Sequence, residues 1–392
     1  QIEEDKRQYA LAEECFKGYS DSQFYLSDYV LKIFEENLNE LIDDTIKKGI
    51  FLTPGKLNLD IIHSQTEWGV GTFARFAAIN LEIPLVHTYH TLYEYYTHYI
   101  FGSRFVKAGK KIAAAISKFY CEKCNALIVP TRKVEDILYS YGVDQTMNII
   151  PTGLELDKFY RGNYSDEDLE FMRESFGIDE SDFLCVYIGR IAEEKSIDLL
   201  IDMFSKIKDE NFKFMIVGRG RILDDLKKQA ENLGISDRVI FTGEVPHDKV
   251  AAYYQMGDVF LNASVSETQG LTFVEAMAAK TPVVARYDLN LEDLLVKNEA
   301  GLVYKDEKEF IDSIMLLKEN KEFREKIIEN AFVASQDYTA QKFGERVEAV
   351  YKKTIEEYDS RESFTIFRGE KFLQQIRRWT SLKSSGRSPW SK

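Results

Sequence analysis

Short apolar segments alternate with amphipathic segments over the second half of the chain. From about residue 183, the runs FLCVYIG, FKFMIVG, RVIFTG, VFLNAS, TPVVAR and GLVY are largely apolar and do not alternate with polar residues. The segments between them, such as SIDLLIDMFSKIKD and LTFVEAMAAK, have apolar residues at helical spacing. Apolar strands without alternation are typical of a parallel sheet that helices cover on both faces. The pattern predicts a doubly wound α/β domain, whose ligands should bind at the carboxyl ends of its strands.

A second region with the same alternation precedes this domain. The runs LDIIHSQ, PLVHTYH, ALIVPT and MNIIPTG predict strands, and a long helical stretch extends from Lys107 to Lys123. The segment PTGLELDKF at 151–159 contains Pro151 and Gly153, which break the pattern and predict a connector. Two α/β domains joined by a connector are expected to face a cleft, a favoured place for a ligand.

The first 50 residues do not fit this scheme. A doubly wound domain should begin with a strand and a glycine-containing turn, but DSQFYLSDYVLKIFEENLNELIDDTIKKG predicts helix. Either the natural start of the domain lies upstream of Gln1, or a helical segment replaces it. The predicted organisation is an atypical helical segment at 1–50, α/β domains at 51–155 and 156–345, and a C-terminal helix with a basic tail at 346–392.

Composition excludes several classes of protein. The chain has 392 residues, 44% of them hydrophobic, which is enough for two buried cores. Its formal net charge of −14 argues against nucleic-acid binding over the whole surface. Four cysteines are too few for a disulfide scaffold, and Cys121-x-x-Cys124 has no second pair to complete a zinc site, so packing inside a helix is the favoured interpretation. No apolar run approaches the roughly 20 residues that a membrane-spanning helix needs.

The segment SETQGLTFVEAMA places two glutamates around a predicted helix start. Gly270 allows close approach of the backbone, and the unpaired N–H groups of a helix start attract an anion such as a phosphate. Glu267 lies in the loop before the helix and Glu275 lies inside it. These carboxylates either accept hydrogen bonds from adjacent sugar hydroxyls or merely favour the helix N-terminus.

Two cations fall at the same edge of the predicted sheet. Arg190 follows the first strand of the domain, and Lys195 comes five residues later in YIGRIAEEKSID. Arg provides a planar fork of donors and Lys a compact charge, so together they can stabilise a departing diphosphate. A single Arg or Lys in a loop is usually solvated, but two of them near a helix start and two carboxylates indicate a binding site.

These residues carry a specific resemblance. The segments GRIAEEKSIDLLIDMF, FMIVGRGRILDDLKKQAENLGISDRVIFTGEVP and SETQGLTFVEAMAAKTPVVA resemble the C-terminal domain of retaining glycosyltransferases of family four, which have the GT-B fold. The resemblance implies that Glu267 contacts the donor sugar, that Glu275 contacts the ribose, and that Arg190 and Lys195 neutralise the diphosphate. It implies neither a metal nor a cofactor, and the sequence offers no Asp-x-Asp metal motif at the site.

The resemblance continues upstream, so that it covers roughly residues 57–355. LDIIHSQTEWGVGTFARFAAINLEIPLVHTYHTLYEYYTHYI is similar to the bacterial branch that glucosylates diacylglycerol. It implies that His90 positions the donor sugar, whereas His87 in the same run is expected to pack in the core. The expected catalytic residues are His90, Arg190, Lys195 and Glu267, and the expected donor-binding residues are Gly189, Gln269, Gly270, Leu271 and Glu275.

The resemblance implies a retaining transfer of glucose from the substrate UDP-glucose to diacylglycerol or monoglucosyldiacylglycerol. In the family's usual mechanism no protein nucleophile acts, and the acceptor attacks the face that the diphosphate leaves. Two alternatives stay open at this point. A relative could act on a polysaccharide or protein acceptor, and a non-catalytic partner or scaffold could keep the GT-B fold.

A lipid acceptor requires contact with a membrane. The segment SRFVKAGKKIAAAISKFY at 103–120 is basic and amphipathic, which suits a helix at the surface of anionic lipid. The tail at 361–392 has eight basic and two acidic residues, a local balance of +6. The alternatives are an ordinary helix packed on a sheet and a solvated tail. We expect a cytoplasmic protein that is peripheral on the inner face of the cell membrane.

Overall fold

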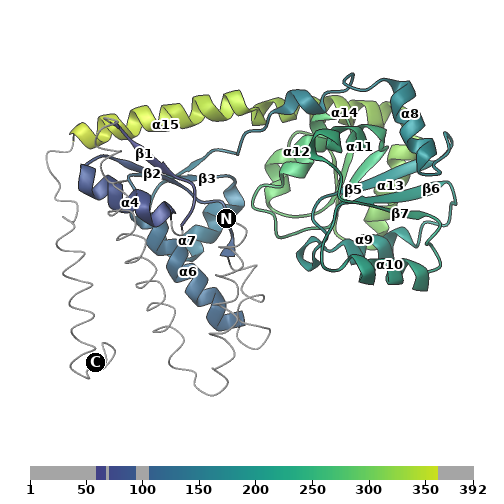
Figure 1. Cartoon of the computed structure of the whole chain (residues 1–392), viewed down its shortest axis with the longest axis horizontal. Helices are drawn as coiled ribbons and strands as arrows, with labels where there is room; N and C mark the ends of the chain where they lie inside the picture. The colour runs from purple at the N-terminus through teal and green to yellow at the C-terminus, as the bar shows by residue number, and fades with distance from the viewer. Residues whose placement is uncertain (1–58, 68–69, 94–105, 361–392) are drawn as a thin grey trace, which may run out of the picture. The chain divides into compact units, whose positions relative to one another are not determined.

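A computed structural model describes residues 59–67, 70–93 and 106–360 (Figure 1). The described residues fall into two compact units, one ending at Ile83 and the other beginning at Pro84. The first unit contains strand β1 (Ile62–Ser64) and helix α4 (Val70–Leu81). All other described elements belong to the second unit. The helix predicted within residues 1–50 and the basic tail at 361–392 lie outside the described residues.

The smaller parallel sheet of the second unit comprises β2 (Leu85–Thr88), β3 (Ala126–Val129) and β4 (Met147–Ile149). Every residue of β2 and β3 is buried, which explains why their sequences do not alternate. Helix α6 (Val106–Glu122) leads into β3, and helix α7 (Arg132–Ser140) follows it. Thr131 caps α7, because its Oγ1 accepts a hydrogen bond from the Val134 N–H.

The larger sheet has six parallel strands in the order β10-β9-β8-β5-β6-β7. From β5 the chain winds through β6 and β7 in one direction, and it then returns to β8, β9 and β10 on the other side of β5. This order makes the boundary between β5 and β8 the point where the winding reverses. The strands are β5 (Phe183–Ile188), β6 (Phe212–Val217), β7 (Val239–Gly243), β8 (Val259–Asn262), β9 (Val283–Arg286) and β10 (Leu302–Tyr304).

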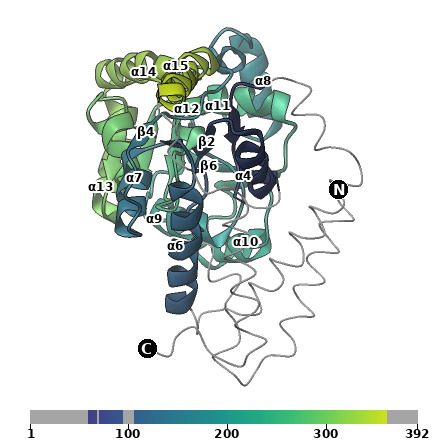
Figure 2. The same cartoon turned by 90° about the vertical axis from the view of Figure 1, so that its left-hand side faces the viewer.

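Helices cover both faces of this sheet, as Figures 1 and 2 show. Leu184, Val186 and Ile188 of β5 point into one core, whereas the alternate residues Phe183, Cys185 and Tyr187 point into the other. The first core is closed by α8 (Asp166–Ser175), α11 (Val250–Met256), α12 (Leu271–Ala278) and α14 (Lys321–Ser335). The second core is closed mainly by α9 (Ile197–Phe204), α10 (Leu223–Asn232) and α13 (Glu307–Glu319).

The connector between the two sheets runs against the start of helix α15 (Ala340–Ser360). Leu154 forms a parallel bridge with Thr339, its N–H donating to the Tyr338 carbonyl at 2.8 Å and its carbonyl accepting from the Ala340 N–H at 2.9 Å. At Gly153 a Cβ atom would lie 2.6 Å from Phe343 Cβ and 2.8 Å from the Thr339 carbonyl oxygen. The connector approaches α15 so closely that only glycine fits at this position.

The main features that the sequence predicts are present. All six apolar runs from residue 183 onward form strands of one parallel sheet, and the upstream runs form β1 to β4. The predicted helix LEDLLVKN is a turn of π-helix, η6 (Glu292–Val296), and the end of the connector is a short 3₁₀ helix, η3 (Leu156–Phe159). Among the described residues, no helix has the length and apolar character needed to cross a membrane.

Gly153 and Gly344 provide a matched pair of substitutions. Gly153→Ala should lower the free energy of unfolding by about 1–3 kcal/mol, because the new methyl group must displace backbone and side-chain atoms. Gly344→Ala, in the interior of α15 with no atom of the described residues within 4 Å of the new Cβ, should raise it by about 0.5–1 kcal/mol. Urea unfolding of both variants measures the difference. A Gly153→Ala protein as stable as its parent would contradict the close approach.

Candidate functional site

A cavity of about 430 Å³ lies at the carboxyl ends of β5 and β8, where the winding of the sheet reverses. This is the place where open α/β sheets bind their ligands. The cavity brings together most of the site residues that the sequence predicts. Its lining includes the predicted residues His90, Gly189, Arg190, Lys195, Glu267, Gln269, Gly270 and Leu271.

One wall of the cavity is the N-terminus of α12. Gly270 precedes the helix with φ 80° and ψ 65°, a left-handed conformation that favours glycine. A Cβ atom there would lie 2.4 Å from Phe273 Cδ2. Leu271 and Thr272, the first two residues of the helix, line the cavity. Their N–H groups lack partners four residues earlier within the helix, so this wall is suited to an anion.

A cation and a carboxylate that contact each other also line the cavity. Lys195 ends the short 3₁₀ helix η4 (Glu193–Lys195), and its Nζ lies 2.5 Å from Oε1 of Glu267. The two side chains are 19% and 17% exposed, so each reaches the cavity while most of its surface is covered. Arg190 is 56% exposed and pairs with the buried carboxylate of Glu194. Both predicted cations therefore have carboxylate partners and lie where a diphosphate could replace those partners.

The loop that carries Arg190 is fixed by its neighbours. A Cβ atom at Gly218, after β6, would lie 1.9 Å from the Gly189 carbonyl oxygen, so the two strand ends are in direct backbone contact. The Tyr187 hydroxyl donates to the Arg190 carbonyl at 3.0 Å. Burial, with the Glu267 and Glu194 carboxylates nearby, raises the pKa of Tyr187 far above its ordinary value. The phenol consequently remains a donor at any physiological pH.

Glu275 is placed differently from the other predicted residues. It lies on α12 but does not line the cavity, and its Oε2 accepts a hydrogen bond from the Tyr254 hydroxyl at 3.0 Å. Burial raises the pKa of Glu275, while the Tyr254 hydrogen bond and the charge of Lys158 oppose that rise. Tyr254 itself is fully buried, so this hydrogen bond orients the carboxylate from inside the core.

Several residues at the site escape prediction from the sequence. Pro130 and Thr152 line the cavity from the ends of β3 and β4, and Asn262 lines it from the end of β8. Tyr254, which holds Glu275, comes from α11. Only the positions of Pro130 and Asn262 indicate a role in the site. Pro130 follows a predicted strand and Asn262 ends one, both at the edge of the sheet where ligands bind. His87 is fully buried in β2, as its predicted packing role requires.

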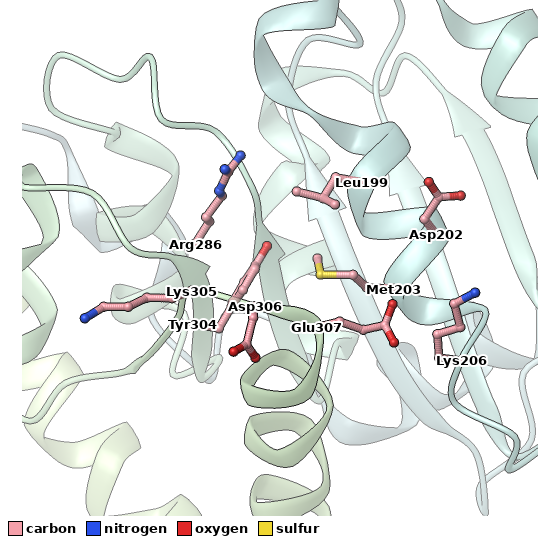
Figure 3. Close-up of a pocket in the computed structure, with 9 residues that line it drawn as sticks. All are labelled: Leu199, Asp202, Met203, Lys206, Arg286, Tyr304, Lys305, Asp306 and Glu307. Carbon is pink, nitrogen blue, oxygen red and sulfur yellow. The ribbon is translucent and has the colours of Figure 1, made fainter.

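A second cavity, of about 470 Å³, lies between α9, the ends of β9 and β10, and the start of α13 (Figure 3). It shares no lining residue with the first cavity and contains none of the predicted site residues. Its acidic and basic side chains are equal in number. The charged residues are Asp202, Lys206, Arg286, Lys305, Asp306 and Glu307. The first cavity is therefore the candidate site, although it is slightly smaller.

No group of three or more His, Cys, Asp or Glu side chains within the described ranges is arranged to hold a metal ion. Cys121 is buried in α6, and the Cys124 thiol donates to the Cys121 carbonyl at 3.0 Å. These thiols pack within and after the helix.

The fold and the site define a GT-B glycosyltransferase. Residues 50–158 match the family described as Glycosyltransferase Family 4, and residues 168–333 match Glycosyl transferases group 1. The fold is similar to that of Anabaena HepE, crystallised in complex with UDP, with a TM-score of 0.66 and 18% sequence identity over 78% of this chain and 81% of that one.

The chain is also similar to two enzymes named alpha-monoglucosyldiacylglycerol synthase. It is 34% identical over 306 residues to that of Acholeplasma laidlawii, covering 77% of each chain. It is 35% identical over 300 residues to that of Streptococcus pneumoniae, covering 76% of this chain and 67% of the other. The chain therefore belongs to the GT-B glycosyltransferase family that these descriptions name, and it is a hexosyltransferase. The predicted family, fold and enzyme class are confirmed.

The raised pKa of Glu275 predicts a pH dependence of stability. Because the folded protein holds this proton more tightly than the unfolded chain, the stabilisation is complete below the ordinary value of 4.5 and is lost as the pH rises through the raised value. Glu275→Gln keeps an acceptor for Tyr254 but does not titrate. Relative to its parent, the variant should therefore gain stability as the pH rises from about 4 to about 7.

Urea unfolding at several pH values measures this trend. Glu348→Gln is the control with the opposite sign, because the Lys352 ammonium lowers the pKa of the exposed Glu348 carboxyl. The parent should therefore gain stability relative to Glu348→Gln as the pH rises above the lowered pKa of Glu348. A Glu275→Gln difference that does not change with pH would show that burial does not act on this carboxyl.

Proposed function

We propose that the protein transfers glucose from UDP-glucose to diacylglycerol, with retention at the anomeric carbon, and so forms an α-linked glucolipid. The observation that carries the proposal is the Lys195–Glu267 pair beside the N-terminus of α12, at the switch point of the sheet. This arrangement offers an anion site and a sugar-binding carboxylate within one cavity. The similarity to two alpha-monoglucosyldiacylglycerol synthases supports glucose as the sugar and diacylglycerol as the acceptor, with monoglucosyldiacylglycerol as a further candidate acceptor.

The donor diphosphate binds between the first N–H groups of α12 and the side chains of Arg190 and Lys195. Its negative charge replaces that of Glu194 and Glu267 as the partner of the two cations. Glu267 is then able to accept hydrogen bonds from the glucose hydroxyls. Backbone donors at a helix start are already oriented before the substrate arrives, so they stabilise developing charge without reorganisation.

Glu275 receives the ribose hydroxyls. Tyr254 donates to Oε2 of Glu275, which leaves Oε1 as an acceptor. The hydrogen bond from Tyr254 also opposes the effect of burial on the pKa, and it thereby favours the ionised carboxylate that two vicinal hydroxyls require.

In the transfer step the bond between the anomeric carbon and the diphosphate oxygen breaks, and the acceptor oxygen forms a bond on the same face of the sugar. The acceptor proton passes to the departing phosphate oxygen. Lys195 and Arg190 stabilise the charge that develops on the diphosphate. His90 lines the cavity beside these groups and positions the sugar.

Helix α6 is the part of the described chain suited to contact with lipid. Ser117 and Cys121 belong to its buried face, whereas Lys110 and Lys111 are exposed and Phe119 is 43% exposed. In Figures 1 and 2 this helix extends beyond the strands of the smaller sheet. Exposed basic and aromatic side chains on a helix favour the headgroup region of an anionic membrane. We therefore place the protein peripherally on the inner face of the cell membrane.

Replacement of Lys195 tests the donor site. Lys195→Met removes the ammonium but keeps much of the side-chain length, so kcat for glucose transfer to diacylglycerol in mixed micelles should fall about 100-fold or more. Lys206→Met, an exposed lysine at the second cavity, is the matched control and should keep parental activity. If Lys195→Met keeps the parental rate, the site is wrong. A parent that transfers glucose to no lipid acceptor contradicts the proposed function itself.

The membrane contact is tested by vesicle sedimentation. Each Lys near an anionic surface contributes about 1 kcal/mol, so replacing both Lys110 and Lys111 by Gln should weaken binding about 30-fold. Replacing Lys227 and Lys228 by Gln on α10 makes the same charge change on another exposed helix and should leave binding at the parental level. Equal losses in both double variants would show that net charge, and not α6, determines membrane binding.

A further inference from the structure

The loop between β8 and α12 is held by a buried lysine of helix α7, which follows strand β3 of the smaller sheet. Lys133, near the start of α7, donates from Nζ to the Val265 carbonyl at 2.8 Å and to the Glu267 carbonyl at 3.1 Å. Its ammonium also pairs with Oδ2 of Asp288 at 2.7 Å. The Lys133 and Asp288 side chains are 7% and 8% exposed. A charge can remain in so buried a place because the ammonium meets three acceptors, one of which is a carboxylate.

Two further contacts join the same loop to residues that follow strands β3 and β4 of the smaller sheet. Thr131 donates from Oγ1 to the Thr268 carbonyl at 2.8 Å. The Gln269 amide pairs with the backbone of Thr152, accepting from its N–H at 2.7 Å and donating to its carbonyl at 3.0 Å. From the other side, the Ser266 hydroxyl donates to the Glu194 carbonyl at 3.2 Å. The backbone around Glu267 is thus fixed by contacts before it, at it and after it.

Glu267 is contacted by two lysines that act on different atoms. Lys195 contacts the carboxylate, whereas Lys133 contacts the backbone carbonyl of the same residue. Because Asp288 neutralises Lys133, this buried ammonium does not compete with Lys195 for the carboxylate. Lys133 therefore constrains the backbone from which the Glu267 side chain extends, and Lys195 constrains the position of its carboxylate.

We propose that Lys133 is a positioning residue for Glu267, and that through it the smaller sheet sets the orientation of the carboxylate that receives the donor sugar. This inference rests on the proposed function, because it takes Glu267 as the group that contacts the sugar. Lys133 does not line the cavity and acts only through the loop. Since the smaller sheet also contributes His90 and Thr152 to the lining, the same contacts set the spacing between both walls of the sugar site.

The test removes the ammonium without leaving a buried carboxylate unpaired. In the double variant Lys133→Met with Asp288→Asn neither side chain is charged, and Asn can still accept the hydrogen bond that Asp288 Oδ1 receives from the Asn290 N–H. We expect kcat for glucose transfer to fall about 100-fold, because a small displacement of a reacting group costs about that factor. The Kd for UDP, measured by titration calorimetry, should stay within about twofold of the parent, because UDP lacks the sugar that Glu267 contacts.

The matched control is Lys318→Met with Asp209→Asn, which makes the same two changes at an ion pair outside this network. It should retain kcat within about threefold of the parent. If Lys133→Met with Asp288→Asn is as active as this control, the proposal is overturned. A parent without transfer activity would instead overturn the proposed function, so the two failures are distinguishable.

Glu267→Gln separates positioning from a general structural effect. If Lys133 acts through Glu267, adding the double variant to Glu267→Gln should lower the residual kcat by less than about threefold. If the losses multiply, Lys133 acts independently of Glu267 and the proposal is wrong. Lys318→Met, which removes a distant ammonium 2.6 Å from Asp209, should leave kcat unchanged in either background.

Discussion

The parallel pairing of β5 with β8 is the contact on which the site depends. Cys185 lies opposite Val259 and Val186 opposite Phe260, although β6 and β7 separate these strands in the chain. Helix α9, after β5, and helix α12, after β8, pack on opposite faces of the sheet, and a cavity lies at the carboxyl ends of the two strands. This pairing brings Lys195, from the end of β5, against Glu267, from the end of β8. Without it, the loop that carries the cation and the loop that carries the carboxylate would not meet.

The electrostatics of the site follow from this juxtaposition. Each cation in the cavity has a carboxylate neighbour, so the site is close to neutral in a protein whose net charge is −14. An anionic ligand can interact with the helix N-terminus and with both cations only if it replaces those carboxylates as their partner. The displaced Glu267 carboxylate can then accept hydrogen bonds from hydroxyl groups. A nucleotide sugar carries both kinds of group in one molecule.

The larger sheet alone does not define the candidate site. Lys133, Thr131 and Thr152 hold the loop around Glu267 from the smaller sheet, and buried charge is tolerated there because Lys133 and Asp288 neutralise each other. Helix α6, which leads into the same smaller sheet, exposes the basic side chains suited to anionic lipid. In the proposed function, the sheet that orients the donor carboxylate is thus also connected to the surface on which the acceptor resides.

The elements, their parallel arrangement and most of the residues that line the candidate site can be predicted from the sequence alone. Periodicity is a local property, so the apolar runs from β5 to β10 and the glycine before α12 are visible without tertiary contacts. Arg190, Lys195 and Glu267 were predictable because strand ends of a parallel sheet share one edge. Only the tertiary structure decided that Tyr254 orients Glu275 and that Lys133 holds the backbone of Glu267. Lys133 and Glu267 lie 134 positions apart in the sequence. Every residue has a backbone carbonyl, so the type of residue at position 267 does not reveal that its carbonyl accepts this hydrogen bond. Such contacts depend on how two sheets pack, which the pattern within each sheet does not specify.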